Sequence, residues 1–214
     1  MLSDYAAIKN GSYGKLMKAY YAKQDAEKLS GKGDTSQKLT LMKTSADSLK
    51  KSADALNDSS LWEKKKIKKK DEKTGEEIEV EDYDWDKITK AVKSFVEDYN
   101  DVVKEAGESN TKDVLRNASW MTGMTDKNSN MLAKIGITIG KGNKLELDED
   151  ALKQADISSL KTVFTGYNSF VSKISQKATG ISNAANRASA TYTNNGMYSK
   201  TDSSFTSSKI DKEV

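Results

Sequence analysis

Residues 85–106 read WDKITKAVKSFVEDYNDVVKEA, and the apolar side chains in this stretch recur alternately three and four residues apart. These side chains are Trp85, Ile88, Val92, Phe95, Tyr99, Val102 and Ala106. A stripe that repeats every 3.5 residues lies on one side of an α-helix and is buried when that helix packs along another helix. The stretch therefore predicts a long helix that needs helical neighbours.

Two further stretches carry the same pattern, so three long helices are expected, over residues 36–57, 85–106 and 166–192. The first stripe consists of Leu39, Met42, Ala46, Leu49, Ala53 and Leu56. The last consists of Tyr167, Phe170, Ile174, Ala178, Ile181, Ala185, Ala188 and Tyr192, with one additional four-residue step that locally relaxes a supercoil. The fold class expected is mainly α, an elongated helical bundle or coiled coil.

Two segments change from the helical period to that of strands. Residues 61–84 contain a lysine-rich run, KKKIKKK, and an acidic run, EEIEVEDYD, separated by a turn with Gly75. Opposite charges on paired strands are favourable, so this segment predicts a charged β-hairpin that projects into solvent. Residues 135–147 contain two short apolar strands, ITI and LEL, around a glycine turn. These predict a second hairpin that packs on the helices.

The expected organisation is one elongated helical domain over residues 1–193, followed by a flexible tail over residues 194–214. The charged hairpin at 61–84 and a small α/β element at 131–165 are insertions in this domain. A helix is also expected over residues 12–29, with Tyr13, Leu16, Met17, Tyr20 and Tyr21 on one packing face. A helix beginning near Thr111 is expected to be interrupted at Gly123 and followed by a short helix over residues 126–134.

Composition excludes many kinds of chemistry. The chain has no Cys and no His, so it has no thiol nucleophile, no thiolate metal site and no imidazole base or ligand. Carboxylate pairs and lysines remain as catalytic groups. The acidic run Asp148–Asp150 lacks the ligand spacing of a calcium loop and is better explained as the first turn of a helix. We therefore expect no enzyme, no catalytic residue, no metal and no cofactor.

Charge and hydropathy argue against several classes of partner. The formal net charge is +3, too small by itself to indicate a nucleic-acid surface, and the basic run is balanced by the acidic run that follows it. No segment approaches the roughly 20 apolar residues that a membrane span requires. The first residues lack the apolar core of a cleaved signal peptide. We expect no nucleic acid, no membrane span and no small-molecule substrate.

Residues 132–166, LAKIGITIGKGNKLELDEDALKQADISSLKTVFTG, resemble the C-terminal region of the bacterial flagellar filament capping protein, a flagellar hook-associated protein. The matching positions are Ile135, Gly136, Ile137, Leu145, Leu147, Asp148, Leu152, Val163, Phe164 and Gly166. Residues 91–103, AVKSFVEDYNDVV, are similar to a helix of the same family through Phe95, Val96, Tyr99 and Asn100. The resemblance implies a structural protein or a short relative of the cap.

The function expected is a non-enzymatic structural or assembly protein related to the flagellar cap, acting through helix-to-helix contacts outside the cell without a cleaved signal. Its partners would be copies of itself, flagellin or hook-associated proteins. Two alternatives remain open: a cytoplasmic export chaperone or adaptor, and a secreted helical module unrelated to flagella. The predicted assembly surface is the last apolar stripe, and Ala185→Glu is expected to weaken association without breaking the fold. That surface comprises Tyr167, Phe170, Ile174, Ala178, Ile181, Ala185, Ala188 and Tyr192.

Overall fold

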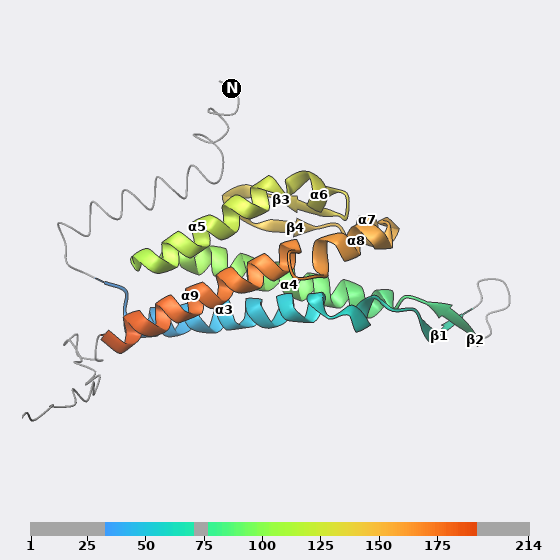
Figure 1. Ribbon diagram of the computed structural model, residues 1–214, viewed down its shortest axis with the longest axis horizontal. Helices are drawn as coiled ribbons and strands as arrows, with labels where there is room; N and C mark the ends of the chain where they lie inside the picture. The colour runs from blue at the N-terminus through green and yellow to red at the C-terminus, as the bar shows by residue number, and fades with distance from the viewer. Residues whose placement is uncertain (1–32, 71–76, 192–214) are drawn as a thin grey trace, which may run out of the picture.

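Four long helices form the body of the protein in a computed structural model, which describes residues 33–70 and 77–191 (Figure 1). These are α3 (Ser36–Asn57), α4 (Trp85–Gly107), α5 (Lys112–Lys127) and α9 (Phe170–Thr191). α3 packs along both α9 and α4, α9 also packs along α5, and α5 contacts α4. The four helices thus surround one apolar core, and the expectation of a mainly helical fold with two small hairpins is confirmed.

Local capping explains where the first two long helices begin. The Thr35 hydroxyl accepts a hydrogen bond from the backbone N–H of Lys38, and the Asp84 carboxylate accepts one from the N–H of Lys87. A side-chain acceptor at this position satisfies one of the N–H groups that the first turn leaves unpaired. Both helices bury the stripe identified in the sequence, with Leu49 and Phe95 fully inaccessible.

Short elements connect the long helices. They are η1 (Ser59–Trp62), α6 (Ser129–Ala133), η2 (Lys141–Asn143), α7 (Glu149–Gln154) and α8 (Ile157–Phe164). The interruption expected at Gly123 is wrong, because α5 continues through this glycine to Lys127. The last long helix begins at Phe170 instead of Gly166, which adopts a positive φ of +100°. The helix expected over residues 12–29 and the tail over residues 194–214 lie outside the described residues.

Aromatic rings from distant parts of the sequence meet in the core beside α4. Trp62 stacks on Phe164 with ring centroids 5.5 Å apart, and Phe95 meets Phe164 and Phe170 edge-on at 6.4 and 6.3 Å. The Trp62 indole N–H donates to the Leu56 carbonyl at 2.8 Å, so its polar atom is satisfied inside the core. Phe95 therefore connects α4 to both α8 and α9.

The second hairpin, β3 (Ile137–Ile139) with β4 (Leu145–Leu147), is fastened to α4 by one amide. The Asn100 amide NH₂ donates to the Leu145 carbonyl at 2.9 Å, and the Leu145 N–H donates to the Asn100 carbonyl oxygen at 2.7 Å. Gly136, just before β3, has a φ of +78°, and a Cβ there would lie 2.6 Å from the Asp148 carbonyl. Only glycine fits at this position without strain.

The first hairpin, β1 (Lys65–Lys70) with β2 (Glu77–Asp82), extends from the end of the bundle opposite residues 33 and 191 (Figure 1). Its antiparallel register places Lys66 opposite Glu81 and Lys68 opposite Glu79, as the charge pattern predicts. Side chains alternate between the two faces of a strand, so the neighbouring residues Ile67 and Val80 share the other face. One face of this hairpin is therefore ionic and the other partly apolar.

Replacing residues 65–82 with two glycines should leave the helical bundle folded. Lys65 and Asp82 are paired across the hairpin, so a short linker can join Lys64 to Tyr83. We expect the far-ultraviolet circular dichroism to keep its helical signal and the midpoint of thermal unfolding to change little. Shortening residues 137–147 in the same way is the control and should lower the midpoint, since Ile137 and Leu145 are buried. Loss of helicity in the first variant would contradict the expectation that the helical bundle folds without β1 and β2.

Candidate assembly surfaces

Most of the predicted assembly surface is buried inside the chain. Phe170, Ile174, Ala178, Ile181 and Ala185 are all inaccessible or nearly so, because α9 turns this face toward the core. Ala188 is half-buried, and Tyr192 lies outside the described residues. Tyr167 precedes α9 and is 83% exposed. Ala185 is fully buried, so we now expect Ala185→Glu to destabilise the fold, since the glutamate would place an unpaired charge in the core.

A repeated polar contact joins α3 to α9 at the border of this buried face. The hydroxyl of Ser182 donates to the Asp47 carboxylate at 2.6 Å, and that of Ser175 donates to Asp54 at 2.6 Å. The two contacts are seven residues apart on each helix and run in opposite order, which fixes an antiparallel register. Burial raises the pKa of both carboxyls, but the hydrogen bonds and the neighbouring lysines outweigh this and lower it.

Removing both serine hydroxyls should destabilise the α3–α9 pair by a modest amount. Each contact is partly exposed, so Ser175→Ala with Ser182→Ala is expected to lower the free energy of unfolding by about 1–2 kcal/mol in total. Denaturant titration measures this change. The control is Gln176→Ala on the exposed side of α9, which should have almost no effect. An equal loss of stability in both variants would mean that the two serine–aspartate contacts contribute nothing specific.

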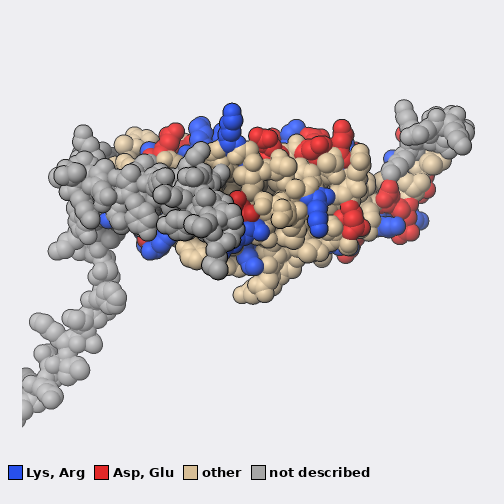
Figure 2. All heavy atoms as spheres, turned by 90° about the horizontal axis from the view of Figure 1, so that it is seen from above, with Lys and Arg blue, Asp and Glu red and all other residues tan. Residues whose placement is uncertain are grey.

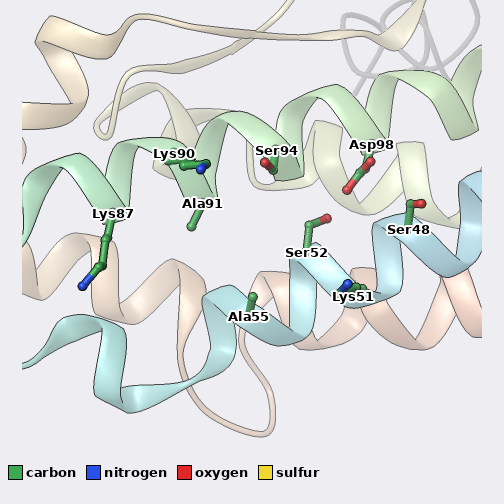
Figure 3. A pocket seen from close by; sticks show the side chains of 9 residues that line it. All are labelled: Ser48, Lys51, Ser52, Ala55, Lys87, Lys90, Ala91, Ser94 and Asp98. Atoms are coloured by element: carbon green, nitrogen blue, oxygen red, sulfur yellow. The ribbon is translucent and has the colours of Figure 1, made fainter.

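A groove between α3 and α4 remains open to solvent (Figure 3). Its lining is mostly short side chains, with lysines at its margins: Ser48, Lys51, Ser52, Ala55, Lys87, Lys90, Ala91, Ser94 and Asp98. Burial raises the pKa of Asp98, and the nearby Asp101 and Glu97 raise it further, while a hydrogen bond with Ser52 lowers it. Short side chains on both walls allow the close approach of another helix.

Asp34 is a polar residue that sequence reasoning did not single out. Its side chain is 1% exposed and accepts hydrogen bonds from the Ser109 hydroxyl, the N–H groups of Asn110 and Thr111, and the Thr111 hydroxyl, at 2.7–2.9 Å. Thr111 itself makes no side-chain capping bond. Asp34 therefore caps α5 from a position 77 residues earlier in the chain. Burial raises the pKa of Asp34, but these donors together hold it below its usual value.

Neither a cluster of metal-ligating side chains nor a membrane-spanning helix is found among the described residues. No group of three Asp or Glu side chains within residues 33–70 and 77–191 is arranged to hold a metal ion. In the same ranges, no helix combines the length and apolar character needed to cross a membrane. Figure 2 shows acidic and basic side chains interspersed along one face of the bundle.

Comparison with known families finds a match for the C-terminal half of the chain. Residues 109–213 match the family described as flagellar hook-associated protein 2 C-terminus. The match contains the whole stretch 132–166 on which the resemblance was based, and it confirms that resemblance to a flagellar cap protein's C-terminal region. Residues 91–103 lie outside the match, so their similarity stays a prediction. No curated protein and no solved structure matches the chain.

The structure gives physical reasons for several residues in the matched segment. Gly136 permits the close approach of β3 to α7, and the Asp148 carboxylate caps α7 by accepting from the N–H groups of Asp150 and Ala151. Phe164 stacks in the core, and Gly166 supplies the positive φ before α9. These residues position the helices of the bundle, and none of them forms a cluster of reactive groups.

Proposed function

We propose that the chain is a non-enzymatic structural or assembly protein related to the flagellar filament cap, and that it acts through contacts between helices. The observation that carries this proposal is the family match over residues 109–213. Its partners would be further copies of the chain, flagellin or hook-associated proteins, and its place would be the flagellum outside the cell. The absence of His and Cys supports a role without catalysis.

The α3–α4 groove is the surface proposed for these contacts. Most side chains of the predicted stripe on α9 are buried in the core, whereas the groove presents short side chains to solvent. Lys51, Lys87 and Lys90 lie at its margins, so it favours a partner helix with acidic residues at its edges. The same groove would serve a cytoplasmic export chaperone that holds a partner helix, which is the second candidate function.

Filling the groove tests the proposed contact. Ser94→Trp places a large side chain in the groove, and Glu97→Trp places one on the exposed surface of the same helix outside the lining. Binding of each purified variant to itself, to flagellin and to hook-associated proteins is measured by sedimentation and co-precipitation. We expect Ser94→Trp to lose at least tenfold in affinity and Glu97→Trp to bind like the unmodified chain. Equal binding by both would overturn the role of the groove.

Location in the cell separates the two candidate functions. The source cells are fractionated into medium, sheared filaments and cytoplasm, and the chain is detected in each fraction. Recovery with the filaments supports the cap-related role. Recovery only in the cytoplasm, bound to an export substrate, would favour the chaperone. A strictly monomeric protein that binds no flagellar component and never leaves the cytoplasm would overturn the proposal of a cap-related role.

A further inference from the structure

The α3–α4 groove changes from positive to negative charge along α4 (Figure 3). Lys87 and Lys90 line the part that belongs to the first half of α4, and Asp98 lines the part that belongs to the second half. Glu97 and Asp101 lie close to Asp98, and burial together with these two carboxylates raises the pKa of Asp98. The three carboxylates repel one another, so the second half of the groove favours a positively charged partner.

These charges are arranged evenly about Ser94, which also lines the groove and is exposed. Lys87 and Asp101 lie seven residues before and after Ser94. Lys90 and Asp98 lie four residues before and after it. Positions four and seven residues apart fall on the same side of an α-helix, so all of these residues share one face of α4. The two halves of this face therefore carry opposite charges at equal distances from its centre.

Most of the charge on this face is available to a partner. Lys87 pairs with the capping residue Asp84 at 3.0 Å, but its side chain remains 69% exposed. Lys90 and Asp101 are both exposed, and neither forms a salt bridge within the part of the chain that the structure describes. A second helix in the groove can therefore pair with these side chains without breaking an internal network.

The walls of the groove leave room for such a helix. Ala91 on α4 and Ser48, Ser52 and Ala55 on α3 are all short side chains. Short side chains allow two helix axes to approach to about 8–10 Å. Lys51, the remaining residue of the α3 wall, is exposed, and its flexible side chain can turn away from an incoming helix.

α4 of a second copy of the chain has the charges that this groove requires. When two copies of α4 lie antiparallel with their Ser94 residues side by side, Lys87 reaches the level of Asp101 of the second copy. Lys90 likewise reaches the level of Asp98 of the second copy. A two-fold axis at Ser94 repeats both pairings, so every contact of this kind joins opposite charges. A parallel arrangement in the same register would instead oppose like charges.

We propose that the occupant of the α3–α4 groove is α4 of a second copy of the chain, and that the two copies form a symmetric antiparallel dimer centred on Ser94. The inference rests on the proposed function, which uses this groove as the contact surface, and it names the partner. Burial of the short side chains supplies the affinity. The ion pairs at the margins contribute little affinity individually, and their main effect is to select the antiparallel register.

The absence of cysteine allows a direct test of the symmetry, because one introduced cysteine is the only thiol. In the full-length chain, Ser94→Cys should be linked to itself by a short bismaleimide, since a residue on the two-fold axis meets its own copy. Two copies of Lys87→Cys would be separated by about 21 Å along the helices, so this variant should link poorly to itself and efficiently to Asp101→Cys in a mixture. Lys173→Cys on α9 is the control and should not be linked. Equal self-linking by Lys87→Cys and Ser94→Cys would overturn the antiparallel arrangement.

An exchange of charge tests the pairing independently. The acidic variant carries Lys87→Glu with Lys90→Glu, and the basic variant carries Asp101→Lys with Asp98→Asn. We expect each variant alone to lose at least tenfold in self-association, measured by sedimentation velocity, because like charges then face each other across the groove. An equal mixture should recover a dimer that contains one copy of each variant, as measured by native mass spectrometry. Circular dichroism verifies that each variant remains helical.

The matched control is Lys153→Glu with Lys173→Glu, which changes the net charge as much as the acidic variant does but lies outside the lining of the groove. It should associate like the unmodified chain. An unmodified chain that stays monomeric, or a mixture that does not associate, would overturn the dimer. If a monomeric chain still bound flagellin and lost that binding with Ser94→Trp, this inference would fail while the proposed function stood. A dimer found only in the cytoplasm would overturn the cap-related role while the dimer itself stood.

Discussion

Phe95→Ala should cause a large loss of stability, about 3–5 kcal/mol in the free energy of unfolding. Phe95 is fully buried on α4, and its ring contacts those of Tyr99, Phe164 and Phe170. Truncation leaves a cavity between three helices that are held by separate segments of the chain. Chemical denaturation followed by circular dichroism measures the change.

Leu41→Ala is the control for Phe95→Ala. Leu41 is a large apolar residue on α3, but half of its surface is already exposed. Its truncation removes little buried area, so the free energy of unfolding should change by less than about 0.5 kcal/mol. Similar losses in the two variants would mean that the aromatic cluster is not the centre of the core.

Asp34→Ala should lower the free energy of unfolding by about 3 kcal/mol. The substitution removes an ionised acceptor and leaves the N–H groups of Asn110 and Thr111 without their partner at the start of α5. Asp34→Asn is the matched variant, because it keeps one acceptor oxygen and should lose less. Asp58→Ala, which removes an exposed cap of a short 3-10 helix, should lose less stability than Asp34→Ala.

Acid should act on Asp34 in a defined direction. The pKa of Asp34 is lower in the folded chain than the usual value of 3.8, so the folded state favours its ionised form. Its contribution is complete above that value and is lost as the pH falls below it toward the folded pKa. The difference in stability between the unmodified chain and Asp34→Asn should therefore be constant near pH 7 and shrink below pH 4. A difference that does not shrink in acid would contradict the ionic role of this carboxylate.

Local pattern was sufficient for much of the fold. The apolar stripes and capping residues predicted α3 and α4 to within a residue or two, and charge pairing predicted β1 with β2. The error at Gly123 has a physical cause: the cost of one helical glycine, about 1 kcal/mol, is offset by the burial of Met121 and Thr125 on either side. The separate helix α8 was not predicted.

The surfaces were harder to predict, because they depend on contacts between distant residues. A heptad stripe shows that a helix must pack, but it does not distinguish a neighbour in the same chain from a partner. The stripe on α9 was therefore assigned to assembly although most of it faces the core. Asp34 gave no local signal, since its partners lie 75–77 residues away. The two serine–aspartate contacts between α3 and α9 did have a signal in the sequence. Asp47 and Asp54 are seven residues apart, and so are Ser175 and Ser182.

The pairing of α3 with α9 has a consequence for the order in which the chain can fold. The contact between Asp47 and Ser182 joins residues 135 positions apart, so α3 can pair with α9 only after all of the intervening residues have been synthesised. Closing so long a loop is entropically costly and slow. A nascent or truncated chain that ends before Phe170 would keep the apolar stripe of α3 exposed. The α3–α9 pair therefore forms only after Phe170–Thr191 has been synthesised, and chains that stop before this helix should be readily cleaved by proteases.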